Sequence, residues 1–169
     1  LLFSLDRYRE SAQAYIEGLQ ERVAAGHDIH RVASVASFFL SRIDVAIDPR
    51  LAQIADSGGA NADLAAGLQG RIAVANAKMA HQAYLGLIAS KEFRALEAQG
   101  ARPQRLLWAS TGTKNPEYSD VMYVEPLIGP DTVNTMPRDT LDAYRDHGEP
   151  ADRIRDGVDE AREALEQLG

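Results

Sequence analysis

The sequence contains no cysteine, which excludes disulfide bonds, a thiol nucleophile and a thiolate metal site. It has no apolar run near the ~20 residues that a membrane-spanning helix requires, and no basic segment followed by an apolar leader. Lysine is scarce, with only Lys78, Lys91 and Lys114 among 18 basic residues. The lack of cysteine, of a membrane span and of a leader favours a soluble, cytoplasmic protein, and the scarcity of lysine favours a piece of a longer chain.

The net charge of −7 at pH 7 argues against a nucleic-acid-binding protein, which needs a basic face to offset phosphate repulsion. It does not argue against a small anionic substrate, because one well-placed arginine or lysine is sufficient. Of the 169 residues, 45% are hydrophobic and 25% charged, a normal balance for a globular domain or for part of a larger one.

The first residues have the character of a strand end. Residues 1–3 are an apolar triplet that runs directly into Ser4, which can cap a helix expected to end at Gly26. A natural chain seldom opens in the middle of a strand, and Leu1 is not methionine. We therefore expect a piece of a longer chain.

Two segments have the composition of buried strands. Residues 32–39 are apolar or small without a turn signal, which is typical of a parallel strand covered on both faces, and residues 105–109 (RLLWA) are the second such segment. Near Ser41 the apolar residues change to helical spacing, so a helix is expected to begin there and to end or kink at Pro49.

Ser37, Phe39 and Arg42 lie where the first of these strands turns into a helix. Ligands of α/β proteins bind at the carboxyl ends of parallel strands, which form the active-site face of a (β/α)8 barrel. An arginine there offers a forked donor for phosphate or carboxylate. The alternative is that Arg42 is a solvated residue of the first helical turn and that Ser37 is a packed small one.

The second strand leads into residues 110–120, STGTKNPEYSD, a loop rich in hydroxyl groups with one lysine, Lys114. Such a loop presents backbone N–H groups and hydroxyls at the top of a strand, where an anion can be held. It lacks the spacing of a P-loop, so by itself it is weak evidence for a phosphate site.

Three further residues are expected at the surface. His27 and His30 are three apart in a link, but no third ligand has a spacing that suits a metal site. Lys78 falls beside His81 in an alanine-rich helical stretch at residues 61–90, where a lysine usually lies on a solvated or salt-bridged face.

Strands and helices alternate along the chain, which predicts parallel β/α units. About four such units are expected, equal to the carboxyl-terminal half of a (β/α)8 TIM barrel. A small four-stranded α/β layer is the alternative, although its edge strands would normally be more polar. The last predicted elements are a short helix, a strand and two amphipathic helices, at residues 118–128, 132–136, 140–147 and 152–168.

Five stretches together resemble transaldolase, most closely the long bacterial type that is sometimes fused to glucose-6-phosphate isomerase. They are LLFSLDRY, RVASVASFFLSRID, ANAKMAHQAY, RPQRLLWASTGTKNPEYSDVMYVEPLIGPDTVNTMP and LDAYRDHG. The resemblance covers nearly the whole chain, and WASTGTKN with PLIGPDTVNTMP is its most specific part. It implies that residues 1–169 are the carboxyl-terminal part of one TIM-barrel domain whose amino-terminal half is missing.

The resemblance also assigns site residues. Ser37, Phe39 and Arg42 match the family pattern Ser-x-Phe-x-x-Arg, in which the arginine binds the substrate phosphate. Ser110 matches the serine of the next strand.

Many transaldolases have a second phosphate-binding arginine two residues after that serine, where this chain has Gly112. Lys114 is the nearest cation that can take its place. A lysine would act as a point charge without the bidentate fork of an arginine.

The implied reaction transfers a dihydroxyacetone unit from a ketose phosphate, sedoheptulose 7-phosphate or fructose 6-phosphate, to an aldose phosphate in the pentose phosphate pathway. It proceeds through a lysine Schiff base and needs no metal or organic cofactor. In the family the Schiff-base lysine lies upstream of the LLFS at residues 1–4, and none of the three lysines here matches its motif. We therefore expect no catalytic nucleophile in this chain.

Two alternatives remain open. One is a class I aldolase that acts on sugar phosphates, whose phosphate site would be alike and whose products alone would differ. The other is a non-catalytic, phosphate-binding half-barrel that pairs with another chain. A half-barrel leaves two unpaired sheet edges, so we expect self-association if the chain is truly this short. The sequence leaves open whether an isomerase domain follows Gly169.

Overall fold

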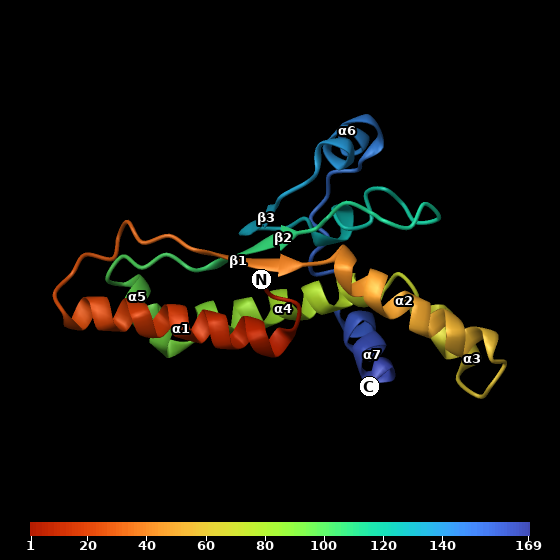
Figure 1. Cartoon of the computed structure of the whole chain (residues 1–169). Helices are drawn as coiled ribbons and strands as arrows, with labels where there is room; N and C mark the ends of the chain where they lie inside the picture. The colour runs from red at the N-terminus through yellow and green to blue at the C-terminus, as the bar shows by residue number, and fades with distance from the viewer.

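The computed structural model describes all 169 residues and shows a three-stranded parallel sheet with helices packed against it (Figure 1). The predicted α/β class is confirmed, and none of the helices is both long and apolar enough to cross a membrane. In chain order the elements are α1 (Leu5–Ala24), β1 (Val35–Phe39), α2 (Ser41–Asp56), α3 (Ala62–Leu68), α4 (Ile72–Ala89), α5 (Lys91–Glu97), β2 (Arg105–Ala109), the 3-10 helix η1 (Glu125–Leu127), β3 (Thr132–Asn134), α6 (Arg138–His147) and α7 (Val158–Leu168).

The strands lie in the order β1-β2-β3, and both pairs are parallel. A fourth strand is expected at residues 1–3, but the structure has an isolated parallel bridge there. The Leu2 N–H donates to the Ser37 carbonyl oxygen at 3.0 Å, and the Phe39 N–H donates to the Leu2 carbonyl oxygen at 2.8 Å. Because α1 begins at Leu5, this pairing ends at once, and the sheet has three strands rather than four.

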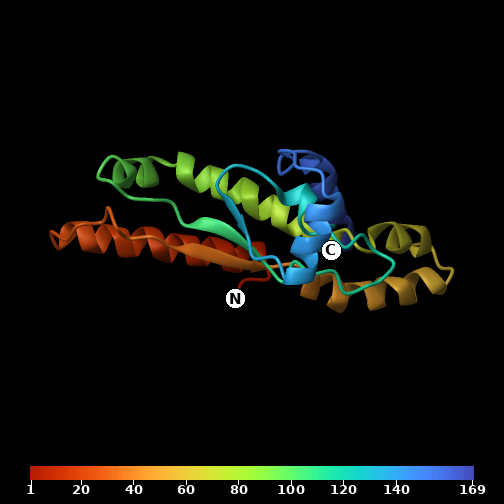
Figure 2. The same cartoon turned by 90° about the horizontal axis from the view of Figure 1, so that it is seen from above.

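One face of the sheet packs against α1 and α4 and forms the main core (Figures 1 and 2). Successive side chains of a strand point to opposite faces, so every second strand residue enters this core. Phe38 and Trp108 are opposite each other in the register and meet edge to face, with ring centroids 6.2 Å apart. Both are buried, and burying a side chain the size of Phe38 contributes roughly 1.5–3 kcal/mol.

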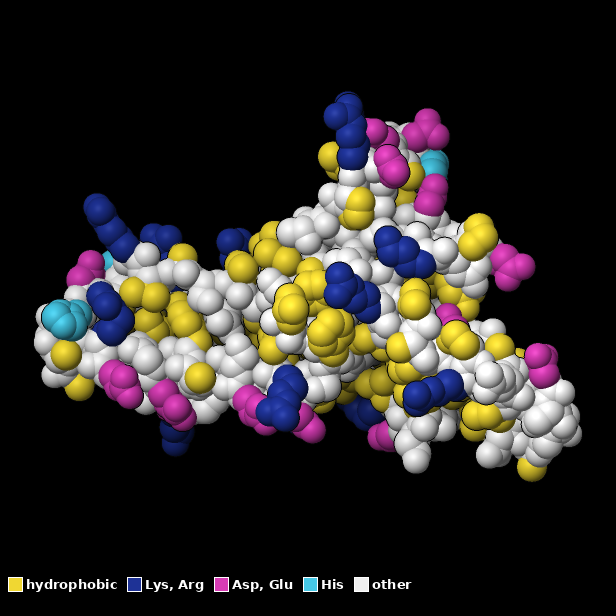
Figure 3. Space-filling model, viewed as in Figure 1, with side chains coloured by type: hydrophobic (Ala, Val, Ile, Leu, Met, Phe, Trp, Pro, Cys, Tyr) yellow, Lys and Arg dark blue, Asp and Glu magenta, His cyan; other side chains and the backbone are white.

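The other face of β1 is only partly covered, so the expectation of a strand buried on both faces is wrong for this structure. Val35 is 41% exposed, and Ser37 and Phe39 are half-buried, whereas the residues between them are buried. On the side of the molecule shown in Figure 3, hydrophobic side chains gather over its middle. The nearly continuous apolar run of β1 therefore has a helical layer on one face alone.

Helix α2 does not end at Pro49, one of the two outcomes expected there, and a glycine interrupts the long helix expected after it. Pro49 lies inside α2, which loses the hydrogen bond to the carbonyl of Val45 but continues to Asp56. The single long helix expected at residues 61–90 is divided into α3 and α4. Gly70 lies between them with φ 69°, a left-handed conformation that cannot continue a right-handed helix.

The short helix expected at residues 118–128 is wrong except for the single turn of η1. The segment consists of turns, and its apolar side chains enter the core without helical geometry. The helix expected from residue 152 also begins later, at Val158, because Gly157 precedes it with φ 60°. The buried residues of the turn segment are Val121, Tyr123, Val124 and Leu127.

Candidate functional site

The carboxyl ends of β1 and β2 are joined by backbone and side-chain hydrogen bonds. The Leu40 N–H donates to the Ala109 carbonyl oxygen and the Ser41 N–H donates to the Ser110 carbonyl oxygen, each at 3.0 Å. The Ser41 and Ser110 hydroxyl oxygens are 2.9 Å apart. The start of α2 and the start of the loop after β2 therefore form one edge, which is where the sequence predicts a ligand site.

Ser110 has a left-handed backbone, with φ 57°. For a residue other than glycine this conformation costs of order 1–3 kcal/mol, and such residues occur often at functional sites. The neighbouring Thr111 is fully buried, and its hydroxyl donates to the Thr135 carbonyl oxygen at 3.4 Å. Thr111 thus holds the loop against the end of β3 while Ser110 turns toward the start of α2.

Arg42 is exposed in the first turn of α2, and its guanidinium carbon lies 5.2 Å from the centre of the Phe39 ring. This cation–π geometry orients the arginine along the open face of β1. Ser37 lies two residues before Phe39, so its side chain points to the same open face. The three residues predicted for the first strand end are therefore on one side of the sheet.

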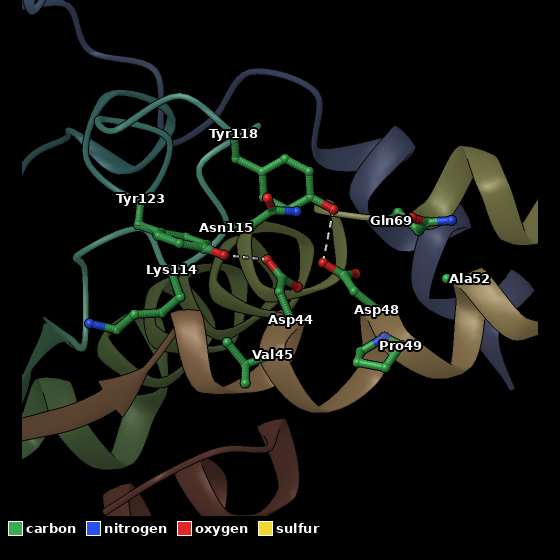
Figure 4. Close-up of a pocket in the computed structure, with 10 residues that line it drawn as sticks. All are labelled: Asp44, Val45, Asp48, Pro49, Ala52, Gln69, Lys114, Asn115, Tyr118 and Tyr123. Atoms are coloured by element: carbon green, nitrogen blue, oxygen red, sulfur yellow. Dashed lines mark hydrogen bonds between the residues drawn. The ribbon is translucent and has the colours of Figure 1, made fainter.

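Lys114 brings a second cation to the same edge. Its Nζ lies 3.8 Å from the place where a Cβ on Gly112 would be. In Figure 4 its amine points away from Asp44 and Asp48. The Lys114 ammonium group therefore lies next to residue 112. Neither Arg42 nor Lys114 takes part in an ion pair in the structure.

A cavity of about 430 Å³ lies between α2 and the loop after β2 (Figure 4). Two hydrogen-bond clusters, neither of them predicted from the sequence, form part of its wall. Their only sequence signal is a pair of aspartates, Asp44 and Asp48, on the same side of a helix. The residues that line the cavity are Asp44, Val45, Asp48, Pro49, Ala52, Gln69, Lys114, Asn115, Tyr118 and Tyr123.

The first of these, the inner cluster, consists of Asp44, Tyr123 and the backbone of Ala73. The Tyr123 hydroxyl donates to Asp44 Oδ2 at 2.7 Å, and the Ala73 N–H donates to Asp44 Oδ1 at 2.8 Å. Asp44 is 2% exposed. Burial raises the pKa of Asp44, and these two donors oppose the increase.

The second, the outer cluster, consists of Asp48, Tyr118 and the backbone of Gly70. The Tyr118 hydroxyl donates to Asp48 Oδ2 at 2.9 Å, and the Gly70 N–H donates to Asp48 Oδ1 at 3.0 Å. Asp48 and Tyr118 are both half-buried. Burial and the hydrogen bond to Asp48 raise the pKa of Tyr118 to about 12, so its hydroxyl remains a donor at neutral pH.

The surface position expected for Lys78 is wrong. Lys78 is 7% exposed, and its ammonium donates to the backbone carbonyl oxygens of Arg153 and Asp156, the former at 3.3 Å. Burial lowers the pKa of Lys78. His81 is buried as well, and its pKa is also lowered by burial. Lys78 therefore fastens α4 to the segment before α7.

The surface position expected for His27 and His30 is confirmed. Both are exposed, and His30 Nδ1 lies in hydrogen-bond contact with Asp28. No group of three or more histidine, cysteine, aspartate or glutamate side chains has an arrangement that could hold a metal ion.

Comparison with known proteins identifies close relatives of this chain. The family model described as "Transaldolase/Fructose-6-phosphate aldolase" matches residues 1–169. The chain is 53% identical to "Transaldolase 2" of Nostoc sp. and 52% identical to "Transaldolase" of Trichodesmium erythraeum, in each case over 99% of this chain and 45% of the relative. It is 52% identical to "Transaldolase" of Mycolicibacterium smegmatis over 88% of this chain and 38% of that relative.

The chain thus spans less than half the length of these curated relatives. The similarity nevertheless includes the strand ends that carry Arg42, Ser110 and Lys114, because the family match extends over the whole chain. The resemblance inferred from the sequence motifs is confirmed. The chain belongs to the transaldolase/fructose-6-phosphate aldolase family.

Proposed function

We propose that this chain is the phosphate-binding, carboxyl-terminal part of a transaldolase. The enzyme transfers a dihydroxyacetone unit from sedoheptulose 7-phosphate or fructose 6-phosphate to an aldose phosphate. The observation that carries the proposal is the pair of cations at the joined strand ends: Arg42 and Lys114 both lie there without an acidic partner. The curated relatives, each named as a transaldolase, support it.

Each site residue has a distinct role in this proposal. Arg42 donates two hydrogen bonds to the phosphate, and the N-terminal dipole of α2 adds to the positive potential around it. Lys114 supplies a second charge beside Gly112, and the Ser110 hydroxyl donates to a phosphate oxygen. Ser37 and Phe39 shape the pocket along the open face of β1.

The carbon–carbon bond breaks in a Schiff base formed between a lysine amine and the substrate ketone, with loss of water. The iminium accepts the electron pair of the broken bond, and the resulting enamine attacks the aldehyde of the acceptor. We propose that this amine lies outside the 169 residues. Lys78 is engaged with two carbonyl oxygens, Lys91 begins α5 far from the strand ends, and Lys114 faces the phosphate position.

The remaining part of the same barrel is the proposed partner of the open face of the sheet. The exposed edge of the Leu2 bridge and the half-covered residues of β1 support this, because a complete barrel would cover both. The chain covers 45% of the Nostoc protein, which leaves enough length for the other barrel strands. In the absence of that part, we expect the open face and edges to cause self-association.

Borohydride trapping with fructose 6-phosphate, followed by peptide mapping, tests the proposal. With the barrel complete, we expect the reduced adduct on a lysine outside this sequence. An adduct on Lys114 would contradict the roles assigned here, because that lysine would then be the nucleophile. A barrel that forms no adduct at all would refute the Schiff-base reaction.

A class I aldolase is the second candidate, since the family description also names fructose-6-phosphate aldolase. Product analysis separates the two. A transaldolase transfers the three-carbon unit to erythrose 4-phosphate, whereas an aldolase releases free dihydroxyacetone.

A further inference from the structure

We propose that Tyr118 and Asp48 are positioning residues that hold the Lys114 loop on the helix carrying Arg42. The proposal rests on the phosphate site described above. It goes beyond that site because neither residue touches the substrate. Their hydrogen bond sets the separation of the two phosphate-binding cations, one of which lies on α2 and the other on the loop after β2.

The first step is that the loop segment around Lys114 is closed on itself. The Thr113 hydroxyl donates to the Ser119 carbonyl oxygen at 2.8 Å. Inside that closure, the Glu117 N–H donates to the Asn115 side chain at 3.0 Å, and the Tyr118 N–H donates to the Asn115 carbonyl oxygen at 3.2 Å. Residues 113–119 therefore move as one unit, and the position of Tyr118 determines the position of Lys114.

The second step is that this unit is fastened to α2 through the outer cluster. Asp48 receives the Tyr118 hydroxyl with one oxygen and the Gly70 N–H with the other. A Cβ on Gly70 would lie 2.9 Å from Cζ of the Tyr118 ring, so the ring lies directly against the glycine backbone. Because Asp48 and Arg42 belong to the same helix, the hydrogen bond from Tyr118 to Asp48 fixes the loop relative to α2 and to Arg42.

The third step is that no other hydrogen bond reaches the middle of the unit. The inner cluster fixes Tyr123, after the unit has ended, and Thr111 fixes the chain before it begins. On the far side, Asp120 contacts His147 at the surface, also after the unit. Loss of the Tyr118 hydroxyl would thus leave both ends of the loop in place and release the segment that carries Lys114.

The test uses the complete barrel, in which these 169 residues are joined to the remaining part, with Tyr118→Phe, which removes the hydroxyl and keeps the ring against Gly70. Tyr15→Phe is the matched control, because the Tyr15 hydroxyl donates to the Arg102 carbonyl oxygen at 2.9 Å at a distant site. Nuclear magnetic resonance titration with inorganic phosphate and with fructose 6-phosphate gives the affinities. We expect Tyr118→Phe to weaken both by roughly 3- to 10-fold, the range of one hydrogen bond, and Tyr15→Phe to leave them unchanged.

A second pair of measurements separates positioning from a general structural effect. In a Lys114→Ala background, Tyr118→Phe should cause no further loss of phosphate affinity, since the cation that it positions is gone. Backbone order parameters should fall within residues 113–119 of Tyr118→Phe without any ligand. An unchanged order in that segment, or an equal loss of affinity in both backgrounds, would overturn the positioning role.

These outcomes also distinguish this inference from the proposed function. If the complete wild-type barrel binds phosphate and Arg42→Ala abolishes binding, the phosphate site stands whatever Tyr118→Phe does. If the complete wild-type barrel binds neither inorganic phosphate nor fructose 6-phosphate, the phosphate site is refuted. The positioning role of Tyr118 is then refuted as well.

Discussion

The inner and outer clusters have the same chemistry and different surroundings. Asp44 and Asp48 lie on one side of α2, and each accepts one tyrosine hydroxyl and one backbone N–H. Both aspartates line the same cavity, but Asp44 is 2% exposed whereas Asp48 is half-buried. Water can therefore replace a lost partner more readily in the outer cluster than in the inner one.

This difference assigns different roles to two otherwise similar arrangements. In the inner cluster an unpaired group would be almost fully shielded from water, so the hydrogen bonds there determine stability. In the outer cluster the same bonds contribute little to stability and determine where an exposed loop lies. Burial, rather than hydrogen-bond geometry, separates a residue that maintains the fold from one that positions the site.

The largest expected effect comes from Asp44→Ala. The substitution leaves the Tyr123 hydroxyl and the Ala73 N–H without a partner in the core. We expect the free energy of unfolding to fall by about 2–4 kcal/mol, measured by urea denaturation. A loss below about 1 kcal/mol would mean that water reaches the inner cluster, and the comparison would fail.

Gly70→Ala is expected to have the next largest effect, because it changes the outer cluster by steric means. Alanine would adopt the left-handed φ of 69° at a cost, and its Cβ would collide with the Tyr118 ring. We expect a destabilisation of about 1–3 kcal/mol in the same assay. Gly67→Ala is the matched control: it lies within α3 and has open space for a Cβ, so it should be neutral or slightly stabilising.

A direct comparison of the two tyrosines should give a smaller effect. Tyr123→Phe leaves a buried carboxylate short of one donor, and we expect a loss of about 1–2 kcal/mol of stability. Tyr118→Phe should cost less than about 0.5 kcal/mol, since Asp48 can bind water instead. Equal losses in thermal or chemical unfolding would contradict the division into a structural and a positioning cluster.

The smallest expected effect is a pH dependence at the surface contact beyond the loop. Hydrogen bonds to Asp120 and then to Asp146 raise the pKa of His147 above its ordinary value of 6.5. The contact therefore stabilises the fold fully below pH 6.5, and this contribution is lost as the pH rises through the higher, folded-state pKa. A titration of the His147 ring by nuclear magnetic resonance measures it, and Asp120→Asn should move the pKa back down.

The outer cluster should respond differently over the same pH range. The pKa of Tyr118 is about 12, so its hydroxyl does not titrate between pH 6 and 9. The order of residues 113–119 should then stay constant while His147 loses its proton. A loop that loosens in step with His147 would show that Asp120, and not Tyr118, positions it.

The sequence was sufficient for features that depend on local patterns. The apolar run before Phe39 and the RLLWA segment predicted both parallel strands, and the rule that ligands bind at strand ends placed Arg42 and Ser110 on one edge. The family resemblance, and not the local pattern, implied that Lys114 takes the place of a cation at position 112. This role stays a proposal, and the Lys114 Nζ lies 3.8 Å from the place of a Cβ on Gly112.

Other features depend on contacts between distant segments, and the local pattern could not predict them. The bond between Tyr123 and Asp44 joins residues 79 positions apart, and Lys78 is buried by carbonyl groups 75 and 78 positions away. A lysine on an alanine-rich helix gives no sign of such partners. The uncovered face of β1 was not predicted either. An apolar strand sequence does not reveal whether the layer that covers it lies within the same 169 residues.

The measurement that tests the central claim most directly compares the affinities of fructose 6-phosphate and fructose in wild-type, Arg42→Ala and Lys114→Ala forms of the complete barrel. A charged hydrogen bond to phosphate is worth about 1.5–3 kcal/mol, so we predict at least a tenfold loss of fructose 6-phosphate affinity for each variant and no change for fructose. Equal changes for both sugars, or no change for either, would contradict a phosphate site formed by Arg42 and Lys114.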